Sequence, residues 1–561
     1  MKTPVIAIGL DAADPHLLEQ WMAAGKLKNL SQLRQQGAYG HLNNTVNYNQ
    51  LPTETSATER LWVMFGTGCL PDKTGYWSPI HYSASDYGIT HDTLDGAYDF
   101  KQYPPFYALG KDYNVAAFDV PVSRLSTDVC GLQNLGWGGH APHTPSHSQP
   151  SEALPRLIEQ YGKNPILHKD YGCWWDRAYV QRIKTGLKAS VETRAKICQD
   201  LLTQENWDLF LTVFGESHTA SHDFWHLSQP DHPLYADKSV PGDDPMLAAF
   251  EAIDLAVGDI VEAAPENAHI VVFAVHGMGK NVTDMYSMAF LPEILYRYSF
   301  PGKYGIAKGR VGDKCPPPVN PRRKSWSGEV WQQRYDSNPL KRALMRWVPS
   351  KFDDYLNAGP IPALASPYRL RQQGLALNWM PAMWYSPLWS QMKAFALPAF
   401  AAGHIRINLK GRETQGIVDV ADYNSVCDEI TQLLYGLANA RTGQPVVKDV
   451  VRTRTDANIL SCQAELPDAD LVVIWHEQPS DVVDSLDLGR IGPVTYYRSG
   501  GHRSAGFLLA KGPTIKPGTQ IEEGQTVDIG PTIRALMGAP AMANCDGKAL
   551  FKSNRVQEIT F

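Results

Sequence analysis

The sequence predicts an α/β protein, with a doubly wound, mostly parallel sheet, helices on both faces and large insertions. Short apolar runs alternate with helical patterns along the chain, which is typical of parallel sheets whose two faces are covered. Several runs end directly before polar side chains, where open parallel sheets bind their ligands. The 561 residues, of which 43% are hydrophobic and 20% charged, are ordinary for a soluble protein. This length suggests roughly two to four domains, or one heavily decorated domain.

The individual elements follow from the apolar runs and from their end signals. The first helix is expected after Asp14, which can cap it, with Pro15 in its first turn. Residues 27–36 predict a second helix that ends at Gly37. The candidate strands are residues 5–9, 115–120, 209–214, 270–275, 405–409, 471–475 and 507–510.

The predicted core comprises residues 1–284 and 403–561, with a decoration at about residues 132–171, and residues 285–402 form a cap. Within this cap, residues 375–402 carry a single charge, Lys393, but three prolines would break a membrane-spanning helix. A buried insertion or lid is therefore favoured over membrane contact. Its aromatic residues favour a substrate with an apolar or planar group; they are Trp379, Trp384, Tyr385 and Trp389.

Composition limits the partners and the compartment. The net charge of -6 gives no general attraction to nucleic acids or anionic membranes, so we expect a small-molecule substrate. The amino terminus lacks the long apolar core of a signal peptide, and no transmembrane segment is expected. Eight scattered cysteines without a CxxC pair predict reduced thiols in a cytoplasmic protein. The oligomeric state stays open.

The densest chemical signal is GESHTASHDFWH at residues 215–226. His218 and His222 are four residues apart, so on a helix both imidazoles project from one face and can share a metal ion. His222 and His226 have the same spacing, and the sequence does not choose between the two pairs. Neutral imidazole suits zinc, iron or copper better than magnesium. The structural alternative is a helix whose histidines bond to the backbone.

Further candidates follow the ends of predicted strands. Asp11 follows the first strand and is a better ligand candidate than Asp14, whose capping role already explains it. Glu216 follows residues 209–214, and His276 follows the valine that ends residues 270–275. His502 and Arg503 lie in a glycine-flanked turn just before residues 507–510.

Taken in order, several motifs resemble the type I phosphodiesterase/nucleotide pyrophosphatase branch of the alkaline phosphatase superfamily. They are GLDAADP (9–15), TERLWVMFGTGCLPDKTGYW (58–77), HDFW (222–225), HGMG (276–279), IRINLKGRETQGIV (405–418), GGHRSAGFLLAKGPTI (500–515) and VDIGPTIRALMG (527–538). The resemblance implies an alkaline phosphatase-like fold in which two metal sites flank a nucleophilic Thr or Ser. It places the nucleophile at Thr58 and an aromatic residue at Trp62, and both Trp62 and Arg503 become candidates for substrate binding.

The resemblance also implies a ligand set that this chain only partly retains. One metal site would use an aspartate, which falls on His218, together with His222 and His502. The other would use Asp11, Thr58 and an Asp-His pair, which falls on Val275 and His276. Two of three expected carboxylates are therefore missing.

A charge count shows what these departures mean. Two dications with Asp11 as the only carboxylate leave about two positive charges uncompensated, which is costly in a buried cleft. The sequence therefore favours one firmly bound zinc or iron(II) ion on His218, His222 and His502, with Glu216 as fourth ligand or supporting partner, and a doubtful second ion.

Three functional hypotheses remain open. The first is a metal-dependent hydrolase of phosphate esters or diesters, or of related sulfate or phosphonate esters, with Thr58 as nucleophile. The second is a non-hydrolytic enzyme, such as a transferase or biosynthetic tailoring enzyme, with one histidine-rich metal site. The third is a metal-binding protein without catalysis.

Overall fold

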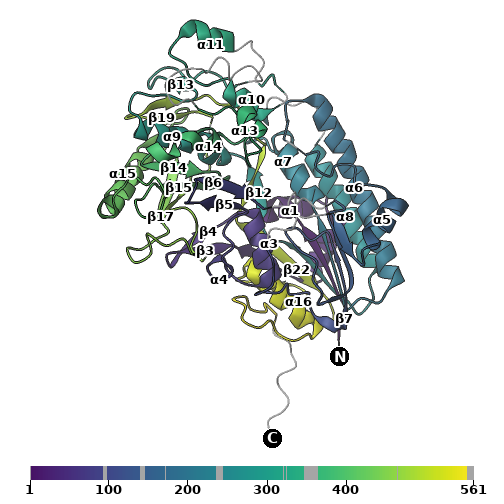
Figure 1. Ribbon diagram of the computed structural model, residues 1–561. Coiled ribbons are helices and arrows are strands. Elements are labelled where there is room, and N and C mark those ends of the chain that lie inside the picture. Colours follow the sequence, from purple (N-terminus) through teal and green to yellow (C-terminus); the bar gives the residue numbers. More distant parts are fainter. Residues whose placement is uncertain are drawn as a thin grey trace.

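The structure is a computed structural model of the chain (Figure 1). It describes residues 2–92, 98–138, 146–170, 172–235, 244–319, 321–323, 325–345, 364–463, 465–479 and 481–551. These residues form a nine-stranded mixed sheet in the order β23-β2-β22-β11-β1-β10-β7-β8-β9, with smaller sheets beside it. The predicted α/β fold is confirmed.

Parallel strands make up the centre of the main sheet. β1 (Val5–Leu10) lies between β10 (Leu209–Phe214) and β11 (His269–Ala274), and β7 (Gly110–Phe118) and β8 (Val129–Leu135) continue the parallel part. β22 (Ala505–Lys511) runs antiparallel to both β11 and β2 (Ala38–Asn43). β9 (His147–Gln149) and β23 (Thr519–Gln520) form the two edges. The sheet edge where β1, β10 and β11 end is therefore shared by three strands.

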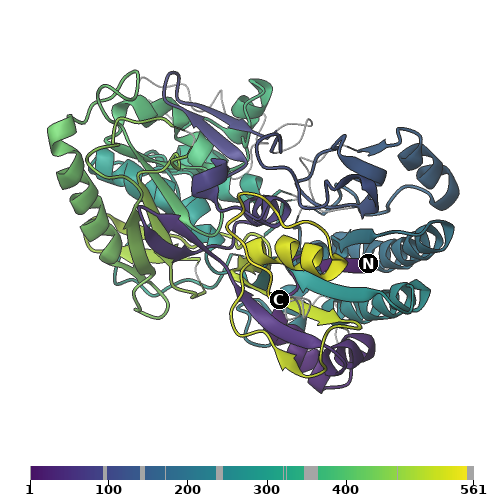
Figure 2. The same ribbon diagram turned by 90° about the horizontal axis from the view of Figure 1, so that it is seen from below.

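Side chains alternate along β1 and divide the core into two layers. Ile6 and Ile8 pack in the cluster that includes α1 (Pro15–Ala23), α2 (Lys28–Gln35), α6 (Arg177–Gln204) and α8 (Pro245–Ala263). Val5 and Ala7 pack on the other face, with α3 (Thr58–Thr67) and α16 (Ile529–Met537). Helices thus cover both faces of the sheet (Figure 2).

The first helix forms as predicted. α1 begins at Pro15, and the backbone N–H of Leu17 donates to Asp14 Oδ1 at 2.8 Å. The second predicted helix is α2, which ends at Gln35, two residues before Gly37. Its first backbone N–H groups are capped by the distant Asp254 of α8, which accepts from Asn29 and Leu30.

Two predicted strands belong to another sheet. β15 (Gly403–Ile407) and β18 (Leu471–Trp475) were expected in the parallel sheet, but they form an antiparallel sheet with β14 (Ala394–Leu397) and β17 (Val447–Arg452). The physical reason is the connection between strands. Only residues 398–402 join β14 to β15, which is too short for the crossover that parallel neighbours need.

This second sheet belongs to a separate lobe, which lies above and to the left of the main sheet in Figure 1 and on the left in Figure 2. Its apolar core runs from Met285 to Val494 and also takes Ile80 and Ile89 from the β5–β6 hairpin (Ile80–Ser83 and Gly88–His91). We therefore propose that the cap, predicted as residues 285–402, extends to about residue 494.

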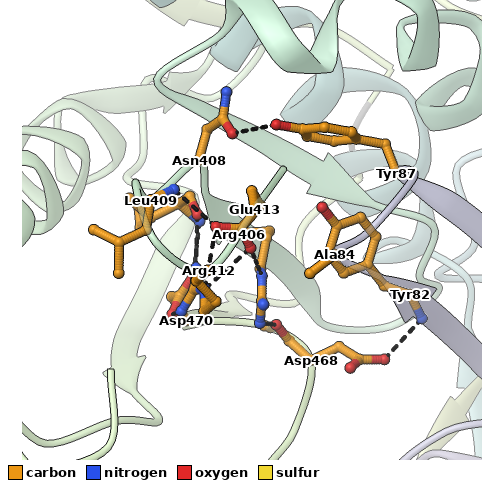
Figure 3. Close-up of polar contacts among 12 residues, drawn as sticks. Tyr82, Ala84, Tyr87, Arg406, Asn408, Leu409, Arg412, Glu413, Asp468 and Asp470 are labelled. Carbon is orange, nitrogen blue, oxygen red and sulfur yellow. Dashed lines mark hydrogen bonds and ion pairs between the residues drawn. The ribbon is translucent and has the colours of Figure 1, made fainter. Parts of the chain in front are cut away.

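Buried ion pairs hold part of this lobe together (Figure 3). Arg412 donates to both oxygens of Asp470 at 2.7 Å, and Arg406 Nε donates to Glu413 at 2.7 Å. The β5–β6 hairpin is fastened to the same region, because the hydroxyl of Tyr87 donates to Asn408 at 2.7 Å. An amino-terminal hairpin is thereby fixed against the lobe.

The remaining expectations concern the decoration, the cysteines and the membrane. The predicted decoration at residues 132–171 includes most of β8, then β9 and α5 (Ala153–Tyr161), so part of it extends the main sheet. All eight cysteines are free thiols. Trp384 and Trp389 of the predicted insertion are buried in the second lobe. Among the described helices, none combines the length and the apolarity that crossing a bilayer requires.

Candidate metal centre

The candidate site lies at the sheet edge where three parallel strands end. Asp11 follows β1, and α7 (Glu216–Ser228) begins two residues after β10. His276 follows β11 by two residues, and Thr58 is the first residue of α3. Side chains from four separate segments therefore meet at the place where open parallel sheets bind ligands.

Three imidazoles converge at this edge. His502 Nε2 lies 3.0 Å from His218 Nε2 and 3.0 Å from His222 Nε2. The three side chains form a group whose ligand atoms lie within 4.8 Å of one another. His218 and His222 are buried on one face of α7, as their spacing predicts.

His502 reaches this face through a two-stranded ribbon. β21 (Gly500–Arg503) pairs antiparallel with β12 (Gly277–Lys280), and His502 is opposite Met278. Because β12 follows β11 directly, the ribbon brings the late histidine to the same sheet edge as His276. His222 also contacts this ribbon, since its Nδ1 donates to Gly500 O at 2.7 Å.

The donor chemistry of the three histidines fits a metal ion. A carbonyl oxygen only accepts, so Nδ1 of His222 carries the proton and a neutral ring turns its Nε2 lone pair towards His502. His502 Nε2 can carry one proton at most, which cannot serve both neighbouring nitrogens. A cation of the zinc or iron(II) type, ligated by imidazole nitrogen, satisfies all three.

Asp11 and His276 form a second polar pair beside the cluster. His276 Nε2 lies 3.6 Å from Asp11 Oδ1, and both side chains are fully buried. The indole N–H of Trp62 donates to the same Asp11 oxygen at 3.2 Å. Trp62 itself is 1% exposed and packs on Phe65 rather than lining the cavity, so its expected contact with substrate is not supported.

The hydroxyl of Thr58 lies next to the cluster. Its Oγ1 is 3.1 Å from Nδ1 and 3.2 Å from Nε2 of His502. As the first residue of α3, Thr58 sits at the positive end of the helix dipole, which favours negative charge there. The geometry therefore brings together a hydroxyl, three imidazoles and a helix amino terminus.

Glu216 is not part of the cluster, which corrects its expected role as a ligand. Both of its carboxylate oxygens accept from Arg194 Nε at 3.1 Å, and Ser190 donates to one of them at 2.5 Å. Arg194 is fully buried, also pairs with Asp119 at 3.0 Å, and needs these charges because an unpaired buried cation is costly. Glu216 thus neutralises the charge of the buried Arg194 guanidinium.

The structure also separates His226 from the cluster. Its ring lies 5.6 Å from the Trp174 ring and 6.1 Å from His232, and it is not among the grouped ligands. Of the two pairs that the sequence leaves open, His218 and His222 are therefore the ones brought to His502. Burial, followed by the charge of His232, lowers the pKa of His226 to about 3.

One residue at this edge carries no sequence signal that would have revealed it. Asn44, fully buried, donates to the carbonyl oxygens of Val275 and Ser504 at 2.7 Å, and its own oxygen accepts from Thr526 N. It joins the end of β11 to the segment that leads into β22. A buried asparagine between strands has no distinctive motif, so only the fold shows this role.

A cavity of about 720 Å³ opens onto the site and is lined by Thr58, His218, His502 and Arg503. Arg503, the candidate for substrate binding, lines it, and Nε of Arg503 pairs with Glu477 at 2.6 Å. Part of the cavity wall is aromatic: Trp379 from the predicted insertion stacks on Tyr497, with ring centroids 5.6 Å apart. Trp384, Tyr385 and Trp389 belong to the core of the second lobe and not to this wall.

A second potential ligand group lies outside the cavity. His16 and Glu19 of α1 and His41 of β2 have ligand atoms within 4.8 Å of one another. His41 Nε2 is 3.0 Å from Glu19 Oε1, and Arg34 also pairs with Glu19 at 3.4 Å. Arg34 already neutralises the charge of the Glu19 carboxylate. This group therefore has a cationic partner of its own, which the imidazole cluster at the sheet edge does not need.

Taken together, the fold and the site define an α/β protein with a hydroxyl group and a histidine cluster that could hold a metal ion at the carboxyl edge of its sheet. The family model of type I phosphodiesterase/nucleotide pyrophosphatase matches residues 5–313. The chain belongs to this family and is a hydrolase of the alkaline phosphatase superfamily.

Similar solved structures include phosphonoacetate hydrolase from Sinorhizobium meliloti 1021 in complex with phosphonoformate, at 12% identity and a TM-score of 0.45, covering 96% of both chains. Murine ectonucleotide pyrophosphatase/phosphodiesterase 5 is 10% identical, with a TM-score of 0.44 and 96% of both chains covered. The human counterpart is 11% identical, with a TM-score of 0.42 and coverage of 97% of this chain and 96% of that one. A search of curated proteins found no match.

Proposed function

We propose that this hydrolase cleaves phosphate diesters or related phosphate, sulfate or phosphonate esters, with Thr58 as nucleophile and one zinc or iron(II) ion on His218, His222 and His502. One observation carries the proposal: the Thr58 hydroxyl lies 3.1 Å from the ring of His502, which itself touches both other histidines at 3.0 Å. The family match supports the reaction class.

Each residue has a role that follows from its position. A divalent metal bound here supplies positive charge, which stabilises an ionised hydroxyl and the charge that develops on the ester oxygens. The bond from His222 Nδ1 to Gly500 O orients that ring, and the start of α3 favours negative charge on Thr58. After Thr58 Oγ1 loses its proton to solvent, its in-line attack on the ester phosphorus or sulfur would form a bond to that atom and break the ester bond to the leaving oxygen, which departs as an alcohol or phenol once protonated. Water would then hydrolyse the covalent intermediate and restore the Thr58 hydroxyl.

We further propose that no second ion is held firmly. Asp11, His276 and Thr58 remain from the second site that the resemblance implies, but Val275 replaces a carboxylate. The Val275 side chain is fully buried in the apolar layer with Phe273 and Val271, so it contributes no charge. A lone carboxylate does not offset a second dication in a buried site.

Replacing Thr58 tests the nucleophile. Thr58→Ala should lower kcat/KM for bis(4-nitrophenyl) phosphate by a factor on the order of 10³ or more, because no neighbouring group replaces the attacking hydroxyl. Thr58→Ser should keep measurable turnover, since it retains the hydroxyl. The measurement is steady-state release of 4-nitrophenolate by metal-reconstituted protein.

The control is Ser56→Ala, which removes another hydroxyl from the wall of the same cavity. This variant should turn over the diester close to the wild-type rate, and metal content should be equal in all four proteins. Wild-type turnover by Thr58→Ala, or loss of turnover in Ser56→Ala alone, would assign the nucleophile elsewhere.

A further inference from the structure

Arg498 lines the same cavity as His218 and His502, and its guanidinium has no hydrogen-bond or ion-pair partner among the described residues. Its Nε is buried without an acceptor. The guanidinium instead lies over two aromatic rings, 5.0 Å from the Tyr497 centroid and 5.7 Å from Phe400. A cation stacked on rings keeps its N–H groups available for an anion at its edge.

The other cations of this wall are already paired within the described part of the chain. Arg503 pairs with Glu477 at 2.6 Å, and Lys448 with Glu54 at 3.5 Å. Arg60 donates to the carbonyl oxygen of Trp77 at 2.6 and 2.8 Å. Arg498 therefore differs from these neighbours in having neither an ion pair nor a hydrogen-bond acceptor among the described residues.

The surrounding backbone holds Arg498 in place. A Cβ added at Gly172, whose φ is +69°, would lie 2.7 Å from Cγ of Arg498, so glycine allows the side chain to pass there. The next residue, Ser499, donates through both its backbone N–H and its hydroxyl to His222 O at 3.0 Å. The backbone next to Arg498 is thus bonded to His222, one of the candidate metal ligands.

A nearby acid does not neutralise it. Asp284 is buried and accepts from Asn281 Nδ2 at 2.9 Å, and it forms no ion pair with Arg498 among the described contacts. Burial raises the pKa of the Asp284 carboxyl above its usual range, an effect that the charge of Arg498 opposes. A carboxyl that tends towards its neutral form is a weak counter-charge.

We propose that Arg498 binds an anionic group that the substrate carries in addition to its scissile ester, on a planar apolar moiety that packs against Trp379, Phe400 and Tyr497. The inference rests on the proposed function for the position of the ester, and it specifies the substrate class as esters of acidic aromatic compounds. The guanidinium supplies two parallel N–H donors for a carboxylate or similar anion. The aromatic wall supplies the contact for the ring.

The test measures binding without turnover, with 2-naphthoate and its neutral isostere 2-naphthamide as probes. By isothermal titration, metal-reconstituted wild type should bind naphthoate at least about tenfold more tightly than naphthamide, since a charged bidentate pair is lost in the amide. Arg498→Gln should remove this preference, and Arg498→Lys should keep part of it. Naphthamide binding should change little in either variant.

Lys448→Gln is the matched control, because it removes a paired cation from the same wall. It should keep the wild-type preference for naphthoate. An equal preference in wild type and Arg498→Gln, an equal loss in Lys448→Gln, or no preference in wild type would each overturn the proposal. These results are independent of Thr58 turnover, so failure of the hydrolytic mechanism would be seen separately in the diester assay.

Discussion

Val275 shows how one residue changes the chemistry expected of a site. Its carbonyl oxygen accepts from Asn44 and from the Thr526 hydroxyl, at 2.7 and 2.8 Å, so the backbone before His276 is fixed. Its side chain belongs to the apolar layer beneath the site. The strand end is therefore kept as a scaffold for His276, while the charge that would hold a second ion is absent.

The buried His226 makes a separate prediction about acid stability. Its pKa is about 3 in the folded protein, lowered by burial and then by His232, against an ordinary value near 6.5. Below about pH 6.5 the His226 imidazole is protonated in the unfolded chain but stays neutral in the folded chain. The free energy of unfolding therefore decreases as pH falls from there towards 3. His226→Gln should reduce the slope of unfolding free energy against pH by up to about 1.4 kcal/mol per pH unit.

Urea unfolding of the metal-free protein at several pH values between 7.5 and 4.5 measures this slope. Above pH 7 the His226 side chain is neutral in both the folded and the unfolded state. The free energies of unfolding of wild type and variant should therefore change with pH by the same amount there. A variant whose slope between pH 6 and 5 equals that of wild type would show that His226 is not buried in its neutral form.

At the scale of single elements, α7 and the β12–β21 ribbon position the three histidines of the site. The spacing of His218 and His222 in the sequence predicts their shared helix face, and strand-end logic predicts Asp11 and His276 at the same edge. The pairing of His502 with Met278 could not be predicted, because the strand partners are more than 200 residues apart in sequence. Glu216 was misplaced for a similar reason, since its partner Arg194 lies on another helix.

The packing of α2 on α8 gives an element-scale prediction. Asp254 accepts from the backbone N–H groups of Asn29 and Leu30 at 3.0 and 2.8 Å and so caps α2 from another helix. Asp254→Ala should destabilise the fold by about 1–3 kcal/mol, because buried N–H groups lose their acceptor. Asp259→Ala, at an exposed position of the same helix, should cost less than about 0.5 kcal/mol.

Thermal unfolding midpoints of the three proteins measure the difference between the two substitutions. Turnover of the diester at a temperature where all three are folded should be equal, since Asp254 does not line the cavity. Equal midpoints for the two variants would show that the inter-helix cap does not stabilise α2.

At the scale of the whole molecule, the central sheet was predictable and the second lobe was not. Four of the parallel strands, β1, β7, β10 and β11, each follow from an apolar run, and their order places the site. The same kind of run at β15 and β18 was assigned to the wrong sheet, because a short apolar strand does not specify its partner. The aromatic wall and Arg498 depend on this lobe, which is why the cavity was only partly foreseen.

The central claim is that three histidines hold one metal ion at the edge of the sheet. Elemental analysis of protein reconstituted with Zn²⁺ or Fe²⁺ and desalted should give about one ion per chain. His222→Ala should retain almost none, whereas His226→Ala, the matched change one helical turn further on, should retain one. Two firmly bound ions per chain, or an unchanged metal content in His222→Ala, would contradict the account.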